Sequence, residues 1–506
     1  MTSSITPSAL WRAGALSALG ALSLLAACAD DPTRPSAAGV HDAQVVPRAG
    51  ITIIPVYSVS VTDLGTLGAA TSGLNQSKAF GINDSGYVTG GSTRTGFSTA
   101  HDNVFRWHTS TGMLYGGLRG TGRDINLSST ITGETYFLPG GINGQAFSLS
   151  AGGVPTGLGF WPNCFESWAV GINDAGHAVG QSRECYPDST GWFRAGTRWD
   201  PWGGKSVYTL GSSYINRISS LFDINNAMQV VGSASDSGGL KVGFRYTPGA
   251  GYELIKPWST TVGVNPQAIN ASGTVAGYET GPFGTFPFRW SPAIGFNYLG
   301  GTGKAFGISA SGYAVGYSDS APVFWKSDGT RLALPRLAGA AAVPCAEWEC
   351  SAQDVNGKLE IVGYDRTAGG EIHAVLWRVK IYYKIIIKLY PFEPFRPLYW
   401  GVDELIPVAV LGTPDFDPRQ IKPGILRLGN DDGSDTPVAR DEYGRPMVSY
   451  QDVDKDGDLD LLLYFSQAAM EKNRDLTPET TVLYLTGDLG GGESLRGVTR
   501  VQVVRQ

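Results

Sequence analysis

The chain is poor in charge and in the residues that most often carry chemistry. Only 17% of its 506 residues are charged, and it contains five His and five Cys. Long helical patterns are absent beyond the first 30 residues. No His has a second His at metal-ligand spacing, and GxSxG, HExxH, Walker and Rossmann patterns are all missing. These absences argue against the common serine-hydrolase, zinc-protease and nucleotide-binding classes.

An excess of basic residues is also missing. The net charge is −6, and residues 381–506 hold 14 Lys and Arg against 20 Asp and Glu, which leaves 25 of each for the first 380 residues. A basic face for nucleic acid is therefore not expected. An acidic C-terminal region suits a cation better than a polyanion.

Glycine is abundant instead. The 69 glycines are about twice the usual share of ~7%, and aromatic residues make up 11% of the chain. Many glycines and aromatics with few charges are typical of short strands joined by tight turns, so the sequence predicts an all-β protein.

The N-terminus has the pattern of an export signal. Residues 13–27 form a short apolar run that ends in small residues, and Cys28 follows directly. "LAAC", Leu25–Cys28, resembles the bacterial lipobox, which implies lipidation of Cys28 and a membrane partner through the lipid anchor. We predict a lipoprotein signal peptide at 1–27 and a flexible tether at 28–55, with plain secretion as the alternative. Asp30 is the second residue after Cys28 and not the first, where an Asp would favour retention in the inner membrane. The signal is therefore compatible with the outer membrane or cell surface.

The other four cysteines form an even set in an exported chain, which favours disulfides. Among three possible connectivities, we expect local pairing of Cys164 with Cys185 and of Cys345 with Cys350. Neither pair has CxxC spacing or a nearby His, so a zinc site is not expected.

Two short anchors recur in alternation along the chain. The first is an apolar residue followed by Asn and a turn, as in "GINDSGYVTGG", residues 81–91, with spacings between 39 and 52 residues. The second is an aromatic stretch such as "VFRW", 104–107. The first anchor begins at Ile82, Ile125, Ile172, Ile224, Ile269, Ile308 and Val355, where Ser309 replaces Asn in the sixth copy.

Each repeat of about 46 residues predicts four short strands, in which Asn and Asp make the first turn and Gly supplies a positive φ. Four strands of this size match a propeller blade, so we predict a seven-bladed β-propeller at 56–380. Residues 61–68, "VTDLGTLG", match the fourth strand and not the first. They would close the ring by pairing with the last unit, which stops at Trp377. An open β solenoid is the alternative.

The repeat with "IN-x-x-G-x-V-x-G" followed by "His-Ala-Phe-Arg-Trp" resembles the HAF family of bacterial extracellular repeats, over roughly residues 60–380. "HAVLW", His373–Trp377, is the copy most similar to the second motif. The resemblance implies an extracellular repeat protein without an established activity.

Residues 381–506 are predicted to form a separate small β-sandwich-like domain. "KIYYKIIIKLY", 380–390, is expected to be a strand leaving the propeller. "IPVAVLGTPDFD", 406–417, is similar to a C-terminal β domain found in other secreted bacterial proteins, and it places the boundary near 381.

The acidic stretch "DVDKDGDLDLLLYF", 452–465, predicts a structural Ca²⁺ site. Hard oxygen ligands alternate along it, and Gly457 allows the sharp bend. Position 12, where an EF-hand has Glu, is Leu463, and "LDLLLYF" is expected to be a strand. The loop therefore more closely resembles the DxDxDGxxD loops of integrin-type and thrombospondin-type repeats. A solvated acidic turn is the alternative, and Mg²⁺ fits less well. The predicted metal residues are Asp452, Asp454, Asp456, Asp458 and Asp460.

The recurrent Trp of the second anchor is interpreted as packing between blades, with a ring of sugar- or peptide-binding subsites as the alternative. Departures from the repeat are better candidates for recognition. Two Cys-containing segments depart from it, 160–168 and 343–350, and ordinary stapled loops are the alternative there. The possible ligand residues in them are Trp161, Glu166, Trp168, Glu347 and Trp348.

Together these features predict a lipid-anchored, non-catalytic binding or structural protein at the cell surface. Its ligand would be an unknown glycan or protein, and no nucleic acid partner is expected. The alternative is a propeller-based polysaccharide hydrolase or lyase, which would need a facing pair of carboxylates.

Overall fold

The computed structural model describes residues 55–505. Short internal stretches are excepted: 70–72, 74, 97–102, 136–143, 186–192, 209, 211–213, 237–238, 258–261, 341–343, 394–395, 415, 432–434 and 491–492. Contacts divide the chain into two units, Met1–Ala43 and Gln44–Gln506. The predicted signal peptide, Cys28 and the tether up to residue 54 lie outside the described residues.

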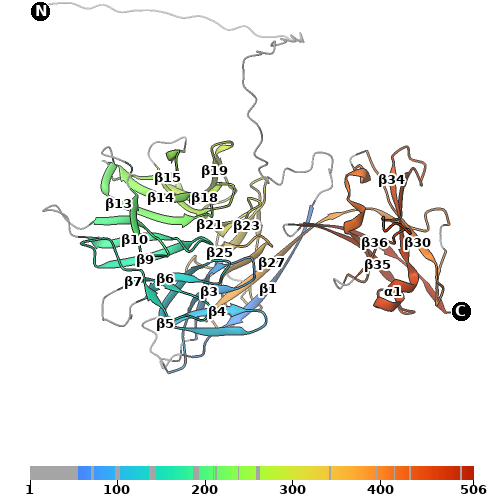
Figure 1. Cartoon of the computed structure of the whole chain (residues 1–506), viewed down its shortest axis with the longest axis horizontal. Coiled ribbons are helices and arrows are strands. Elements are labelled where there is room, and N and C mark those ends of the chain that lie inside the picture. Colours follow the sequence, from blue (N-terminus) through green and yellow to red (C-terminus); the bar gives the residue numbers. More distant parts are fainter. Residues whose placement is uncertain are drawn as a thin grey trace, which may run out of the picture. The chain divides into compact units, whose positions relative to one another are not determined.

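The described part is nearly all β, with antiparallel strands that follow one another in groups of four (Figure 1). The first eight strands of these groups are β2 (Ser77–Ile82), β3 (Val88–Ser92), β4 (Asn103–His108), β5 (Gly112–Ile125), β6 (Ile131–Thr135), β7 (Gln145–Leu149), β8 (Thr156–Gly157) and β9 (Glu166–Ile172). The next eight are β10 (Ala178–Cys185), β11 (Phe193–Trp199), β12 (Lys205–Tyr208), β13 (Tyr214–Ile224), β14 (Val230–Asp236), β15 (Lys241–Thr247), β16 (Gly251–Ile255) and β17 (Gly263–Ile269).

The remaining strands of these groups are β18 (Val275–Gly281), β19 (Gly284–Ser291), β20 (Gly295–Tyr298), β21 (Gly303–Ile308), β22 (Ala314–Ser318), β23 (Ala321–Trp325), β24 (Arg331–Ala333), β25 (Ser351–Val355), β26 (Glu360–Arg366), β27 (Ile372–Lys384) and β1 (Pro55–Gly65). Sheets this small bury their residues only by packing against neighbouring sheets. The recurrent tryptophans provide that packing, since Trp199, Trp325 and Trp377 are almost fully buried. The packing interpretation of the aromatic anchor is therefore confirmed.

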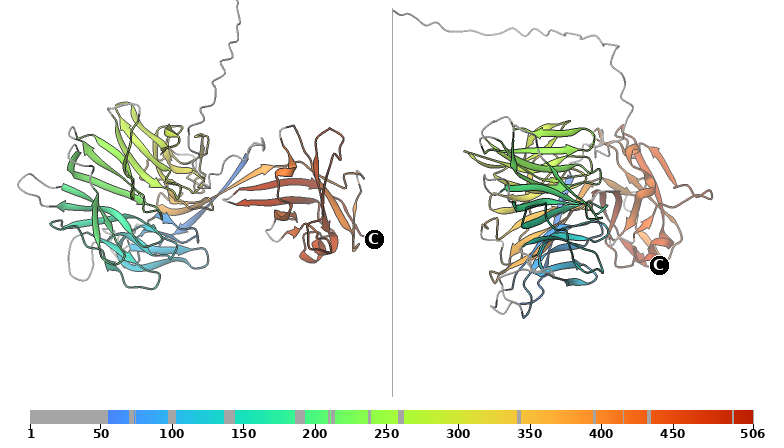
Figure 2. Two further views of the ribbon diagram at one scale, coloured as in Figure 1. Left: turned by 45° about the horizontal axis from the view of Figure 1, so that its top comes forward. Right: turned by 60° about the vertical axis from the view of Figure 1, so that its left-hand side comes forward.

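The first strand of the array pairs with the last. β1 lies beside β27 (Figure 2). The two strands are antiparallel, with Val61 opposite Trp377 and Pro55 opposite Tyr383. A side-chain hydrogen bond also links the two strands, because Nδ1 of His373 in β27 lies 2.9 Å from the Asp63 carboxylate in β1. This hydrogen bond is the largest cause of the raised pKa of His373. The predicted closure is confirmed, but with other bounds. The closing strand is Pro55–Gly65, so residues 66–68 lie beyond it, and β27 continues past Trp377 to Lys384.

The turns between first and second strands form a circuit of hydrogen bonds. Asn83 Oδ1 accepts from the backbone N–H groups of Ser85 and Tyr87, which holds its own turn. Its Nδ2 donates to Asn126 O of the next group at 2.8 Å. The same donation runs from Asn126 to Asn173 O, Asn173 to Asn225 O, Asn225 to Asn270 O, Asn270 to Ser309 O, and Asn356 back to Asn83 O.

The circuit returns to its starting residue, so the groups are arranged in a ring. One link is lost at Ser309, whose hydroxyl accepts from Tyr313 N but cannot provide the amide donor. A ring of small antiparallel sheets is a propeller-type arrangement.

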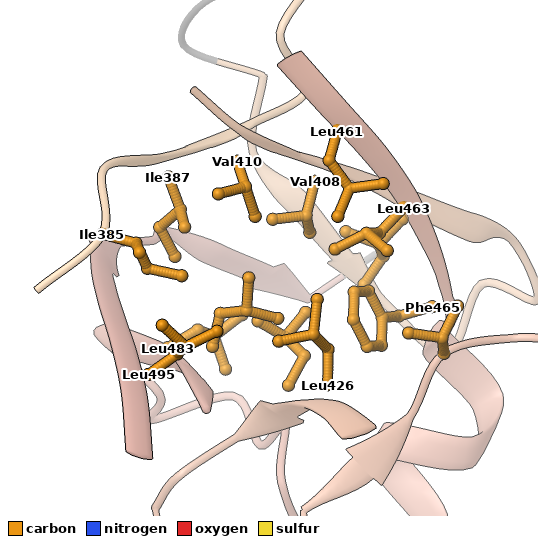
Figure 3. Close-up of a cluster of buried hydrophobic side chains, with 14 of the residues drawn as sticks. Ile385, Ile387, Val408, Val410, Leu426, Leu461, Leu463, Phe465, Leu483 and Leu495 are labelled. Atoms are coloured by element: carbon orange, nitrogen blue, oxygen red, sulfur yellow. The ribbon is translucent and has the colours of Figure 1, made fainter. Parts of the chain in front are cut away.

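Two sheets make up most of the C-terminal region, and a hydrophobic cluster lies between them (Figure 3). One sheet contains β28 (Ile387–Leu389), β30 (Leu405–Val410), β34 (Asp460–Ser466) and β33 (Val448–Gln451). The other contains β36 (Glu493–Arg500), β35 (Val482–Gly490), β31 (Leu426–Gly429) and β32 (Thr436–Pro437). The smaller elements are β29 (Leu398–Trp400), β37 (Val503–Arg505), the 3₁₀ turns η1 (Pro418–Gln420) and η2 (Pro423–Ile425), and α1 (Gln467–Asn473).

β27 connects this region to the ring. Its C-terminal residues Ile381–Lys384 pair in parallel with Glu493–Arg496 of β36, so one sheet runs from β25 to β32. The predicted domain boundary at 381 falls within this strand. Glu493 is buried, and it accepts a 2.8 Å hydrogen bond from the Tyr313 hydroxyl of the ring.

Candidate functional site

A small cavity lies at the centre of the ring, at the ends of the Asn turns. Its volume is about 230 Å³, and it is lined by residues from the first anchor of every group. The Asn side chains lining it already donate to the next turn and accept from their own turn. The Asn amide groups at this end of the ring are therefore already used in hydrogen bonds that hold the sheets together.

Three carboxyl groups lie one residue before these anchors. Asp124 Oδ2 accepts from Ile172 N at 2.7 Å, Asp223 Oδ2 from Ile269 N at 2.8 Å, and Asp354 Oδ2 from Ile82 N at 2.9 Å. Each carboxyl also accepts from the residue that follows it. Each Asp therefore links its own group to the next one.

Burial raises the pKa of all three Asp residues, and repulsion from other carboxylates adds to the effect. The pKa of Asp124 is raised to about 7 by burial and by the charge of Asp354. Burial raises the pKa of Asp354 to about 6 and that of Asp223 well above its usual range. These buried acids make the stability of the ring sensitive to pH.

A second cluster lies about 13 Å back along the first strands, four residues before the anchors. Lys78 Nζ lies 4.3 Å from the ring centroid of Tyr364, and Phe80 contacts the same tyrosine edge-on. The arrangement is repeated elsewhere, because Lys304 lies 5.3 Å from the ring centroid of Tyr278 and Phe306 contacts that tyrosine. Both copies come from the same five letters, "KAFGI", at 78–82 and 304–308.

The loop closed by Cys345 and Cys350 lies against both copies. Lys78 Nζ donates to Trp348 O at 2.7 Å, while Lys304 Nζ lies 2.9 Å from the Glu347 carboxylate. Tyr364 also donates its hydroxyl to Glu347 O at 2.9 Å. These contacts fix the loop backbone, and yet the Trp348 side chain is 62% exposed. The predicted recognition loop thus presents a free aromatic ring on a rigid frame.

The other predicted loop is held separately. Its disulfide joins Cys164 to Cys185, so both predicted cysteine pairs are present. Trp168 is half-buried, with the Arg183 guanidinium 4.0 Å from its ring centroid, and Glu166 lies 3.8 Å from Arg183. Trp161 is half-buried and donates its backbone N–H to Ser182. Among the described residues, no hydrogen bond or ion pair joins this loop to the one at 345–350.

The acidic stretch 452–460 folds into a tight loop. It brings together carboxylate oxygens of Asp452, Asp454 and Asp460 within 4.8 Å of one another, while Asp456 and Asp458 lie outside that group. Asp452 accepts from the backbone N–H groups of Lys455, Asp456 and Gly457.

Asp460 is fully buried, and its two oxygens accept from Gly412 N and Val453 N. Asp454 Oδ1 is a buried atom without a hydrogen-bond partner. Burial and the charges of Asp460 and Asp456 raise the pKa of Asp454. The donor set is all oxygen, which suits Ca²⁺.

Sequence reasoning missed two of these features. The "KAFGI" pair was visible as an exact repeat within the repeats, but its contact with Tyr364 and Tyr278 depends on the neighbouring sheet. The three Asp residues occupy the position directly before the first anchor, where the other groups have Gly or Ala. This difference was the signal in the sequence that could have identified them. No helix among the described residues is long and apolar enough to cross a membrane.

Comparison with known proteins gives no family. No family model matches the chain, and no curated protein matches it. Among solved structures, virginiamycin B lyase from Staphylococcus aureus is 10% identical, with a TM-score of 0.40, over 64% of this chain and 99% of that one. A streptogramin B lyase structure is 9% identical, with a TM-score of 0.38, over 64% and 98%.

A prolyl endopeptidase structure is 10% identical, with a TM-score of 0.33, over 69% of this chain and 47% of that one. At these TM-scores the likenesses carry no argument about activity.

Proposed function

We propose that this chain is an exported, lipid-anchored surface protein that uses a seven-bladed β-propeller to bind a ligand without catalysing a reaction. The circuit of turns, complete except for the link missing at Ser309, supports a ring, and each turn counts as one blade. The HAF-like repeat supports an extracellular setting, and "LAAC" at Leu25–Cys28 supports a lipid anchor at Cys28.

One observation carries the binding proposal. The disulfide loop at 345–350 interrupts the repeat, and two copies of the Lys–Phe–Tyr cluster hold it in place. A binding site is expected where a rigid scaffold presents a departure from its own pattern. Trp348 offers an apolar face for a sugar ring or an aromatic side chain, and Glu347 and Lys304 offer polar groups beside it.

The C-terminal loop supports a structural Ca²⁺ site in the same protein. Asp452, Asp454 and Asp460 supply the clustered carboxylates, and an ion there would relieve their mutual repulsion. Because the loop begins directly after β33 and ends in β34, a bound ion would stabilise the C-terminal sheet that contains both strands.

A glycan array probed with the purified protein tests binding, and chromatography of incubated polysaccharides tests catalysis. Trp348→Ala should abolish binding, whereas Trp202→Ala should not, because Trp202 is a tryptophan even more exposed than Trp348 (75%) and lies outside the 345–350 loop. Release of short sugars from a polysaccharide would refute the hypothesis of a non-catalytic protein and favour the alternative of a polysaccharide hydrolase or lyase.

A further inference from the structure

Strand β36 has a gap along one edge. β27 pairs with it only from Glu493 to Arg496, and Ile385 N then donates to Arg496 O at 3.0 Å before the chain turns away. The next contact on that side is Leu398 N to Gln502 O, at 2.9 Å. Between Arg496 and Gln502, no described strand of this chain pairs with the edge, although Ile387 of β28 packs against Gly497.

The backbone groups of Val498 and Arg500 point into this gap. Val501 N donates to Thr481 O of the neighbouring chain segment, and the register places Arg500 opposite Val482. Antiparallel ladders alternate, so the odd-numbered residues bond to β35 and the even-numbered ones face outward. The carbonyl groups of Arg496 and Gln502 face outward, as this alternation requires. Among the described residues, the one hydrogen bond to the outward groups of Val498 and Arg500 is a long contact from Thr499 Oγ1 to Arg500 O, at 3.5 Å.

A cavity of about 540 Å³ opens beside the gap. Its walls include four apolar residues, Ile387, Leu389, Leu398 and Val501, of which Leu398 is almost fully buried. Three basic residues also line it, Lys388, Arg396 and Arg500. Arg396 is oriented by Glu404 at 2.6 Å, whereas Arg500 is exposed.

The charge of this cavity is opposite to that of its surroundings. Residues 381–506 are acidic overall, with 20 Asp and Glu against 14 Lys and Arg, and yet the residues that line the cavity include no acid. Arg396 is already paired with Glu404 and Glu393, and the charge of Lys388 also acts on Asp454. Arg500 forms no ion pair with a described residue, so it supplies most of the free positive charge that favours an anionic occupant. Open backbone donors and acceptors on a sheet edge select an extended peptide.

We propose that this edge binds a short, extended, acidic segment of a partner protein as an added β-strand. The outward N–H and C=O groups of Val498 and Arg500 would pair with its backbone, and Lys388 and Arg500 would face its carboxylates. Ile385 and Leu398 close the two ends of the gap. The six steps along the strand from Arg496 to Gln502 span about 20 Å, so the occupant pairs over about four residues. This site is independent of the proposed ligand loop on the ring.

The test is fluorescence anisotropy of the purified protein with a labelled hexapeptide of alternating Glu and Val, and with its Lys–Val counterpart. Val498→Pro removes one outward N–H at a position where an edge strand tolerates proline, and Val498→Thr is its matched control. Arg500→Glu reverses a charge in the groove. Arg505→Glu is its control, because Arg505 is an exposed arginine of the same region, paired with Glu479 outside the groove.

The Glu–Val peptide should bind and the Lys–Val peptide should not. Val498→Pro and Arg500→Glu should each weaken binding by about fivefold to tenfold, in line with one lost hydrogen bond or charge contact, while both controls bind as the parent does. Equal binding of both peptides, no binding, or no effect of Arg500→Glu in a folded variant would overturn the proposal. Self-association that Val498→Pro abolishes would identify a second copy of the chain as the occupant and would also overturn it.

Discussion

Replacing Asn126 separates the two roles of the recurrent Asn. Asn126→Ser keeps an oxygen that can hold the turn, as Ser309 does for Tyr313 N, but it removes the donor to Asn173 O. Asn173 O also accepts from Gly176 N at 3.0 Å, so no carbonyl is left unpaired. The loss should therefore be one ordinary buried hydrogen bond, about 1 kcal/mol of unfolding free energy.

Asn126→Ala should cost more, because it also removes the acceptor for Thr130 N at 2.9 Å. Because Thr130 is half-buried, its unpaired N–H adds about 1 kcal/mol, the low end of the penalty for a buried group, for a total of about 2 kcal/mol. Ser309→Asn should have the opposite sign, since it supplies the missing donor toward Asn356 and gains about 1 kcal/mol. Urea unfolding followed by tryptophan fluorescence measures all three. If Asn126→Ser is as unstable as Asn126→Ala, the side chain does not have two separate roles, one as acceptor within its own turn and one as donor to the next group.

Three further predictions concern pH, calcium and disulfides. Unfolded Asp titrates near pH 3.9, so raised pKa values of Asp124 and Asp354 mean that the folded ring holds protons that the unfolded chain has released. The urea midpoint should therefore fall as pH rises from about 5 to 8, and Asp124→Asn should flatten that slope; a midpoint that rises with pH contradicts the assignment. Chelation by EGTA should lower the melting temperature, by an amount that corresponds to about 2.7 kcal/mol if free Ca²⁺ was a hundredfold above Kd. Asp454→Ala should remove this shift, and the same loss in Asp488→Ala, an acid outside the loop, would argue against a specific site. Replacing Cys164 and Cys185 by Ser should cost about 3 kcal/mol and replacing Cys345 and Cys350 about 2 kcal/mol, because the first pair closes the longer loop; equal denaturation midpoints for the two double variants would contradict the entropic account.

The sequence allowed the repeat, the turns, the closing strand and the disulfide pairs to be predicted, since each depends on local chemistry or on periodicity. Asn83 was identified as a turn residue because Asn bonds to its own backbone. Its second bond, to Asn126 O of the next group, depends on how two sheets pack. No pattern in a single repeat contains that information.

The candidate sites were predictable only in part. Trp348 is a candidate from the sequence because its segment departs from the repeat. Lys78 and Lys304 follow the repeat, so the same criterion does not identify them. Of the five Asp residues expected around a cation, Asp452, Asp454 and Asp460 come together. Asp456 instead accepts from Asp458 N inside the turn. Sequence spacing places acids in one loop, but backbone direction decides which carboxylates converge.

The pairing of β1 with β27 also sets the order in which the protein can be completed. Asp63 and Val375 are opposite each other although more than 300 residues separate them in the chain. During synthesis, β1 emerges first and must wait without its partner until the last strand of the ring has been made. Contacts this distant in sequence form late, and an unpaired strand edge is a template for aggregation in the meantime. A chain that stops before residue 372 lacks β27 and would keep that edge open permanently, so premature termination here produces an aggregation-prone fragment and not a smaller working protein.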